Sequence, residues 1–348
     1  MTMSQPELSP PPPSRRSRGF RAVVIGVSLV IVGALITVGV RQVAKPIGTT
    51  QPSAYSSAPP IGTFSRHPVV ITLPVHQASY LGAFAKGVPH SYAPVKSFAD
   101  ATGAHLNVAL YYSGWYEKFQ NSFATDAKDN GAVPFIQIDP TGISFAGIVD
   151  GDFDRYLKSI ATDVASYGAR TGQGVIIGFG HEMNGRWFSW GYEHVAPRLF
   201  VAAWRHIVNV FRQQGADDVT WLWTVNIIDV RNKIPSPAPW WPGSSYVTWV
   251  GIDGYYLKPS WSFASLFGPT IKAVHKLTFD PILISETGAS PAVGQRAKIS
   301  DLFAGVRAYG LLGFVWFDGK GNQNWTLSSR AAFAAFRRGA KTFDEATP

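Results

Sequence analysis

Residues 174–185 read GVIIGFGHEMNG, and residues 281–288 read PILISETG. Each stretch begins with a short, nearly continuous apolar run, and a glutamate follows the run within three residues. Apolar runs without polar alternation are typical of parallel strands that helices cover on the outside. We therefore expect the two glutamates, Glu182 and Glu286, at the carboxyl ends of two parallel strands.

The same pattern recurs along residues 66–348, where apolar runs alternate with amphipathic stretches. The predicted strands are Tyr80–Phe84, Leu106–Tyr111, Val133–Ile138, Gly174–Phe179, Val219–Thr224, Val247–Ile252, Pro281–Ser285 and Leu312–Phe317. The predicted helices are Val95–Thr102, Phe153–Tyr167, Pro197–Gln214, Phe263–Leu277, Arg296–Tyr309 and Ser328–Arg338. Residues 225–246 are rich in proline and tryptophan and are predicted to form a long loop.

Eight strand–helix units predict an α/β fold, the (β/α)8 or TIM barrel, whose usual size is about 250 residues. The alternative is an open doubly wound sheet. Such a sheet usually carries a glycine-rich phosphate loop after its first strand, whereas residues 81–84 read LGAF. In a barrel the functional residues lie at the carboxyl ends of the strands. The fourth and seventh strands face each other across that opening, so Glu182 and Glu286 are predicted to meet there.

The residues before the barrel divide into three segments. Residues 1–21 are polar and basic, residues 22–40 carry no charge, and residues 41–65 are rich in small residues and proline, as flexible linkers are. The nineteen uncharged residues nearly span a hydrocarbon core of about 30 Å, at about 1.5 Å per residue. We therefore predict a transmembrane signal anchor at residues 22–40.

The charges that flank this segment set its orientation. Four arginines precede it within residues 15–21, and two basic residues, Arg41 and Lys45, follow it closely. The positive-inside rule then places residues 1–21 in the cytoplasm and the barrel outside the cell, tethered to the cell membrane. Cleavage as a secretory signal, which would give a secreted protein, is the alternative.

Composition excludes several classes of site. The chain has no cysteine, which excludes disulfides, zinc–cysteine sites, iron–sulfur clusters and a cysteine nucleophile. Of the net charge of +9, residues 1–65 carry +5 (six basic residues, one acidic) and residues 66–348 carry +4 (25 basic, 21 acidic). A domain this mildly basic has no nucleic-acid footprint, and we expect a monomer with no nucleic-acid partner.

Two glutamates that face each other suit the hydrolysis of a glycosidic bond. One must be protonated to donate to the leaving oxygen, and the other must be ionised to attack the anomeric carbon. Their surroundings must therefore separate their pKa values. A metal is not predicted, because Gly185 stands where a zinc-binding H-E-x-x-H motif has its second histidine, and no cofactor is implied.

Other side chains at the predicted opening suit a sugar ligand. Aromatic faces provide platforms for sugar rings, and Asn226 could bind the sugar 2-hydroxyl, a contact that strengthens in the transition state. The candidate platforms are Trp115, Trp240, Trp241 and Trp316. Asp139, Asp253 and Asp318 also end strands and are candidates to bind hydroxyl groups.

At these motifs the chain resembles glycoside hydrolase family 26, a retaining (β/α)8 family. The resemblance rests on HEMNG at 181–185 with Trp187 and Trp190-Gly191, on WVGIDGY at 249–255 and on SETG at 285–288. It implies that Glu182 is the general acid/base and that Glu286 is the nucleophile. It further implies that His181 binds substrate and orients the acid, that Tyr255 hydrogen-bonds the nucleophile, and that Trp187 and Trp316 stack on sugar rings.

Two departures from the family pattern bear on the substrate. Many mannanases of the family carry arginine three positions before the histidine, where this chain has Gly178, and many members show Ser-Pro-Asn where residues 221–226 read WLWTVN. The resemblance implies endo-cleavage of a β-linked polysaccharide, first β-1,4-mannan, with mixed-linkage β-1,3/1,4-glucan and β-1,3-xylan as alternatives. A non-catalytic, membrane-tethered barrel that binds polysaccharide and a tethered factor that trims exported polymer are the remaining hypotheses.

Overall fold

The computed structural model describes residues 72–229, 231, 233–320 and 323–343. The basic tail 1–21, the predicted anchor 22–40 and the linker 41–65 all lie outside these residues. Across the ranges that are described, no helix is both long enough and apolar enough to cross a membrane.

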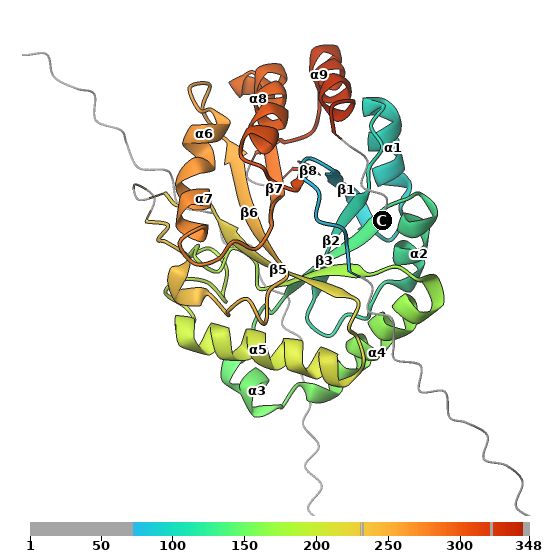
Figure 1. The fold of residues 1–348 in the computed structure, drawn as a ribbon, viewed down its shortest axis with the longest axis vertical. Coiled ribbons are helices and arrows are strands. Elements are labelled where there is room, and N and C mark those ends of the chain that lie inside the picture. The colour runs from blue at the N-terminus through green and yellow to red at the C-terminus, as the bar shows by residue number, and fades with distance from the viewer. Residues whose placement is uncertain (1–71, 230, 232, 321–322, 344–348) are drawn as a thin grey trace, which may run out of the picture. The chain divides into compact units, whose positions relative to one another are not determined.

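Eight parallel strands close into a barrel in chain order, and β8 pairs with β1 to complete it (Figure 1). The strands are β1 Tyr80–Pro89, β2 Val108–Gly114, β3 Val133–Asp139, β4 Val175–Phe179, β5 Val219–Asn226, β6 Trp249–Tyr256, β7 Ile282–Ala289 and β8 Gly313–Asp318. Each predicted strand overlaps one of them. The closed barrel confirms the predicted fold and rules out the open doubly wound sheet.

Helices surround the strands on the outside (Figure 1). They are α1 Ala93–Thr102, α2 Asn121–Asp129, α3 Phe145–Asp150, α4 Asp154–Thr171, α5 Pro197–Gln213, α6 Phe263–Leu266, α7 Gly268–Val274, α8 Gln295–Ala308 and α9 Arg330–Ala340, with short 3₁₀ turns η1 Ala238–Trp240 and η2 Pro291–Val293. The helix predicted at Phe263–Leu277 is two helices, because Gly268-Pro269 begins a new one and proline cannot continue the first. Sequence reasoning missed α2 and α3, which are short and bury few apolar side chains.

Alternate residues of each strand point into the barrel, as the period of two in a strand requires. The apolar interior consists of Tyr80, Val108, Leu110, Val133, Phe135, Ile176, Leu222, Trp249, Leu283 and Val315 with their neighbours. The other strand residues pack against the helices in a second, larger cluster. The interior therefore forms a packed floor, and functional groups lie above it at the carboxyl ends of the strands.

A buried polar layer lies between this floor and the opening. Gln137 of β3 donates to Thr224 of β5 at 3.0 Å, past Gly178 of the intervening β4, and neither residue is more than 1% exposed. Gly178 makes room for Gln137, because a Cβ at position 178 would lie 2.0 Å from its Oε1 atom. Position 178, where many mannanases carry arginine, is glycine in this chain. The side chain of Gln137 occupies the space that a side chain at position 178 would need.

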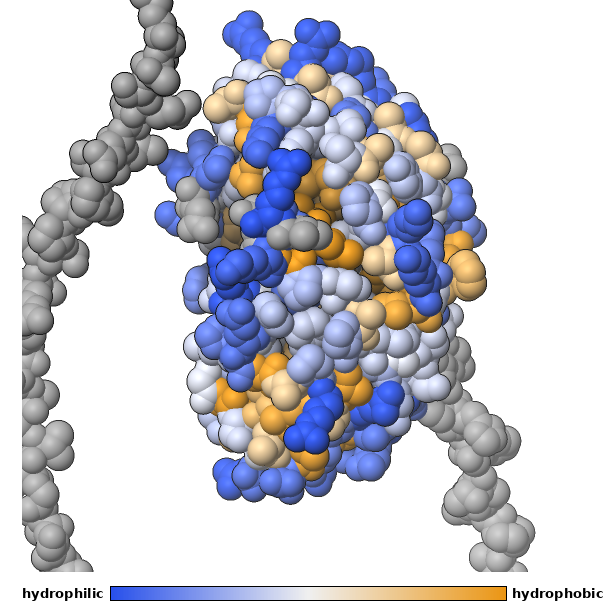
Figure 2. All heavy atoms as spheres, turned by 90° about the vertical axis from the view of Figure 1, so that its left-hand side faces the viewer, coloured by the Kyte–Doolittle hydropathy of each residue, from blue (hydrophilic) through white to orange (hydrophobic). Residues whose placement is uncertain are grey.

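On the face seen in Figure 2, hydrophilic residues cover most of the area and hydrophobic residues form smaller patches between them.

Candidate active site

Glu182 and Glu286 line one cavity of about 890 Å³ at the carboxyl end of the barrel. Seven of the thirteen residues named above as candidates for the site line it: Asp139, His181, Glu182, Trp187, Asn226, Tyr255 and Glu286. Glu182 lies in the loop after β4, and Glu286 lies within β7. The prediction that the ends of these two strands share one opening is confirmed.

Glu182 is held by its backbone and by two side-chain donors. Its φ of 54° is left-handed, an unfavourable region for a residue with a Cβ, and its N–H donates to the carbonyl of Thr224 at 3.0 Å. The indole of Trp187 donates to Oε2 at 2.6 Å, and the amide of Asn226 donates to Oε1 at 2.5 Å. The carboxyl group is therefore fixed in the cavity wall, with the side chain 8% exposed.

These surroundings change the acidity of Glu182. Burial raises its pKa, the positive charge of His181 lowers it, and the negative charge of Glu286 raises it, so that the pKa reaches about 7. A carboxyl group with this pKa is substantially protonated at neutral pH. Proton donation to a leaving oxygen requires that state.

Glu286 accepts a hydrogen bond on each oxygen. Tyr255 donates to Oε2 at 2.6 Å, as the family resemblance implied, and Tyr112 donates to Oε1. Burial raises the pKa of both tyrosines well above the ordinary value, and the charge of Glu286 raises them further, so both hydroxyls keep their protons and donate. The two hydroxyls hold the Glu286 carboxylate from both sides.

Tyr112 is a site residue that the sequence reasoning missed. It lies on β2, two residues beyond the buried interior residue Leu110. The alternation of strand residues therefore signalled that Tyr112 points into the barrel. The predicted strand ended at Tyr111, and Trp115 was taken as the candidate from the segment that follows it.

His181 faces an acidic partner. Its Nδ1 lies 3.1 Å from Oδ1 of Asp139, a close charge pair that lacks the alignment of a hydrogen bond. Burial lowers the pKa of His181, but Asp139 raises it more, and the pKa reaches about 9. His181 is therefore an imidazolium at neutral pH, and Asp139 lines the cavity beside it.

Asp253 lies on β6, next to Glu286 of β7. It pairs with Glu286 in the β6–β7 register, is completely buried, and accepts a hydrogen bond from Ser285 at 2.6 Å. Burial raises its pKa well above the ordinary range, and the charges of Glu286 and Glu182 raise it further. The suggestion that Asp253 binds a sugar hydroxyl is wrong for this structure, because the side chain does not reach the cavity.

Asp318 stabilises a loop. Its Oδ1 accepts the backbone N–H of Leu327 at 3.0 Å, which holds the chain that follows β8. It is not among the residues that line the cavity.

Aromatic side chains form much of the cavity wall. Phe84 and Phe317 stack with their ring centroids 4.5 Å apart, and the ring centroids of Trp325 and Tyr255 are also 4.5 Å apart. Trp187 is 46% exposed while its indole N–H holds Glu182. Trp187 therefore leaves much of its ring exposed beside the acid.

Two predicted platforms lie elsewhere. Trp316 is completely buried and packs 6.0 Å from Phe336 of α9, because its neighbours Val315 and Phe317 take the inward positions of β8. Trp115 packs against Phe153, Tyr156 and Phe179, away from the cavity. Trp316 is therefore wrong as a substrate-stacking residue in this structure, and Trp115 does not line the cavity.

The strand-five loop tryptophans are also packing residues. Trp240 is 2% exposed, and Trp241 packs 5.0 Å from Trp223. From this loop, the cavity is lined instead by Ile227, Asp229 and Ile234.

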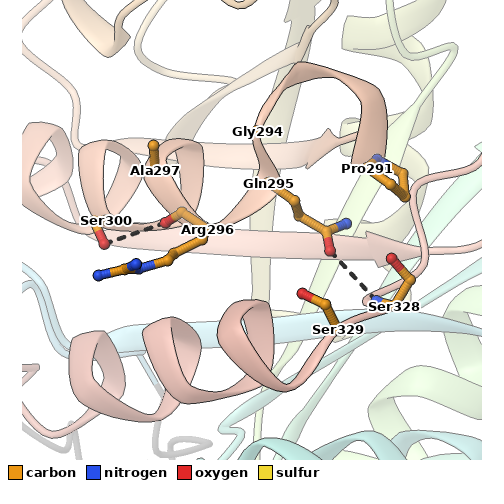
Figure 3. A pocket seen from close by; sticks show the side chains of 8 residues that line it. All are labelled: Pro291, Gly294, Gln295, Arg296, Ala297, Ser300, Ser328 and Ser329. Carbon is orange, nitrogen blue, oxygen red and sulfur yellow. Dashed lines mark hydrogen bonds between the residues drawn. The ribbon is translucent and has the colours of Figure 1, made fainter.

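A second hollow, of about 580 Å³, lies between the N-terminal ends of α8 and α9 (Figure 3). Gln295 there accepts the N–H of Ser328 and donates to two backbone carbonyls, so its polar atoms are all used. None of the described residues that line this hollow carries a carboxylate. Within the described ranges of the chain, no group of three or more histidines, cysteines or acidic residues is arranged to hold a metal ion.

Solved structures support the fold. A Bacillus subtilis mannanase, BCman, superimposes with a TM-score of 0.57 at 20% identity, over 75% of this chain and 85% of that chain. A modular endo-β-1,4-mannanase from Cellulomonas fimi gives a TM-score of 0.59 at 17% identity, over 76% of this chain and 71% of that chain. These likenesses show that the barrel is shared.

Two curated proteins are similar in sequence. Endoglucanase H of Acetivibrio thermocellus is 30% identical over 274 residues, which cover 74% of this chain and 30% of that protein. Mannan endo-1,4-β-mannosidase A and B of Caldalkalibacillus mannanilyticus is 28% identical over 86 residues, which cover 23% of this chain and 16% of that protein. The chain thus spans less than a third of the length of either relative.

The family model for glycosyl hydrolase family 26 matches residues 102–295. That range contains both glutamates and the strands that carry them, β4 and β7. It also contains β2, β5 and β6, which supply Tyr112, Asn226 and Tyr255. The chain therefore belongs to glycosyl hydrolase family 26.

Proposed function

We propose that the barrel is a retaining endo-β-glycosidase that hydrolyses a β-linked polysaccharide. One observation carries the proposal: two buried glutamates share one cavity, and their surroundings differ. Glu182 has a pKa of about 7, whereas Glu286 is held by two tyrosine hydroxyls. Membership of the family and the relatives named endoglucanase and mannosidase support the same class of reaction.

The proposed reaction has two steps. First, the Glu286 carboxylate attacks the anomeric carbon while protonated Glu182 donates its proton to the leaving oxygen. The glycosidic bond breaks, and a covalent bond joins the sugar to Glu286. Glu182, now ionised, then takes a proton from a water molecule, whose oxygen attacks the anomeric carbon and releases Glu286.

The neighbouring side chains have defined roles in this proposal. Asn226 holds Glu182 and borders the cavity, where it can also bind a sugar hydroxyl. The imidazolium of His181 supplies positive charge beside both carboxyl groups. Trp187 offers its exposed ring to the sugar next to the cleaved bond.

For the substrate we propose β-1,4-mannan, with mixed-linkage β-1,3/1,4-glucan as the second candidate. Similarity to the Caldalkalibacillus mannosidase and to the mannanase folds favours mannan. The longer match to a protein named endoglucanase H favours glucan, and glycine at position 178 departs from many mannanases. We further propose that the barrel acts outside the cell, tethered by residues 22–40.

The test is a polymer panel: β-mannan, glucomannan, mixed-linkage glucan, β-1,3-xylan and cellulose, each incubated with the protein and with Glu286→Ala. We expect new reducing ends on one polymer, lost in Glu286→Ala and kept in the control Glu193→Ala, which changes an exposed glutamate of the loop after β4. Cleavage that survives in Glu286→Ala would contradict the nucleophile assignment. A folded protein that binds one polymer and cleaves none would favour the non-catalytic barrel.

A further inference from the structure

The loop that joins β6 to α6 forms one wall of the cavity. Leu257 and Trp261 of this loop are among the lining residues. The backbone N–H of Trp261 donates to the carbonyl of Lys258 at 3.1 Å, which closes a tight turn. The Lys258 ammonium lies 5.4 Å from the centre of the Trp261 ring. The indole is therefore supported from its own loop while it borders the cavity.

Helix α8 holds the same loop through Lys298. This lysine is 8% exposed, which is unusual for a side chain that is almost always at the surface. Its ammonium donates to the carbonyl of Pro259 at 2.6 Å and to the carbonyl of Trp261, and it lies 5.6 Å from the Tyr256 ring centre. Lys298 thus binds the backbone of the residue that lines the cavity.

Asp301 holds the two ends of the loop. It lies three residues after Lys298, on the same face of α8. Its Oδ2 accepts from the hydroxyl of Tyr256, the last residue of β6, at 3.0 Å. It also accepts from the N–H of Phe263, the first residue of α6, at 2.6 Å. Lys298 in the middle and Asp301 at the ends fix the loop against α8.

Burial of an ammonium is unfavourable unless hydrogen bonds satisfy it. An apolar side chain at position 298 would fill the same space without that penalty, but it would leave the carbonyls of Pro259 and Trp261 without this donor. The arrangement therefore fixes the loop backbone rather than only filling space. A fixed backbone at residue 261 fixes where the indole side chain begins, and the Lys258 ammonium supports its ring at the border of the cavity.

We infer that Trp261 is a sugar-stacking residue at a subsite away from the cleaved bond, and that Lys298 is the positioning residue that presents it. The inference rests on the proposed function and adds a determinant of polymer affinity. The side chains that hydrogen-bond Glu182 and Glu286 are Trp187, Asn226, Tyr112 and Tyr255, and Trp261 is not one of them. Loss of Trp261 should therefore weaken binding of long substrates without changing the chemistry.

The test compares the cleaved polymer with a 2,4-dinitrophenyl β-glycoside of one sugar, which fills only the positions next to the glutamates. Trp261→Ala should raise KM for the polymer about tenfold, equivalent to about 1.4 kcal/mol, and leave kcat/KM for the aryl glycoside unchanged. Lys298→Met should also raise KM for the polymer. Lys298→Gln, which keeps a donor for the carbonyls, should restore most of the affinity.

A double variant separates positioning from general stability. If Lys298 acts through Trp261, then Trp261→Ala with Lys298→Met should bind the polymer no more weakly than Trp261→Ala alone. Lys272→Met, which removes an exposed lysine of α7, is the matched control and should change nothing. Thermal unfolding of every variant shows which of them remain folded at the assay temperature.

Three results would overturn the inference. They are an unchanged polymer KM in folded Trp261→Ala, effects that add in the double variant, and an equal loss on both substrates in Lys298→Met. Failure of the proposed function looks different, because then the unaltered protein cleaves neither substrate, or its cleavage does not depend on Glu286.

Discussion

Glu182 accepts hydrogen bonds from an indole and an amide, whereas Glu286 accepts them from two tyrosine hydroxyls. One type of side chain thus has two environments within one cavity. Such a difference lets one carboxyl group hold a proton while the other attacks. The proposed division of roles depends on these four donors, and two of them can be tested separately.

The pKa of Glu182, about 7, predicts the alkaline side of the pH profile. As the acid must be protonated, kcat/KM should fall as the pH rises through about 7. Asn226→Ala removes a donor to the carboxylate, which destabilises the ionised form, raises the pKa and moves this limb to higher pH. Initial rates on a soluble substrate between pH 4 and pH 10, for the unaltered protein and for Asn226→Ala, measure the position of this limb. A limb that stays in place when Asn226 is removed would show that another group controls it.

Replacement of Tyr112 by phenylalanine should lower the rate of hydrolysis. Tyr112→Phe removes one hydrogen bond to the Glu286 carboxylate, and bonds to charged groups contribute about 1.5–3 kcal/mol. We therefore expect kcat/KM to fall roughly ten- to hundredfold. Tyr111→Phe is the matched control, because Tyr111 packs outward 5.2 Å from Phe123 of α2. Equal losses in the two variants would argue against a special role for Tyr112.

Strand β8 shows how far the sequence determines an element. The apolar runs were sufficient to predict eight strands, their parallel arrangement and the meeting of Glu182, after β4, with Glu286 of β7 at one opening. They were not sufficient to fix which residues point inward, because a nearly continuous apolar run carries no alternation. The prediction therefore chose Trp316, whereas Phe317 faces the cavity. Tyr112 was missed for a related reason, since β2 continues beyond its apolar run.

Substitution by alanine should affect stability at Trp316 and substrate binding at Phe317, its neighbour in β8. Trp316→Ala leaves a cavity against α9 and should lower the free energy of unfolding by about 3–5 kcal/mol, with KM unchanged for the folded protein. Phe317→Ala removes a cavity wall and should raise KM with a smaller loss of stability. Chemical denaturation and initial rates on the same preparations measure both. A raised KM in folded Trp316→Ala would restore Trp316 as a binding residue.

The whole barrel accounts for contacts that no local pattern predicts. Tyr112 of β2 reaches Glu286 of β7, and Gln137 of β3 reaches Thr224 of β5. Both contacts join strands that are not neighbours in the barrel, and they depend on strand register and closure rather than on sequence spacing. This is why the glutamate pair was predictable from two strand ends, while the side chains that surround each glutamate were not.

Within residues 66–348, the residues that the structure describes form one compact unit. We predict that this unit, produced without residues 1–65, keeps the kcat/KM and the unfolding temperature of the full chain. We also predict that the full chain remains with the membrane fraction of its host, and that deletion of residues 1–40 releases it. Full-length chain recovered intact from the soluble fraction would contradict the proposed anchor.

The central claim is that Glu286 forms a covalent bond with the substrate. The direct measurement is to incubate the protein with a 2,4-dinitrophenyl 2-deoxy-2-fluoro-β-glycoside of the cleaved sugar and to identify the labelled peptide by mass spectrometry. The fluorine slows the second step, so the glycosyl-enzyme should accumulate. We predict one fluoroglycosyl group on Glu286, and none in Glu286→Ala. A label on Glu182, or no adduct on a protein that cleaves its polymer with inversion, would contradict the account.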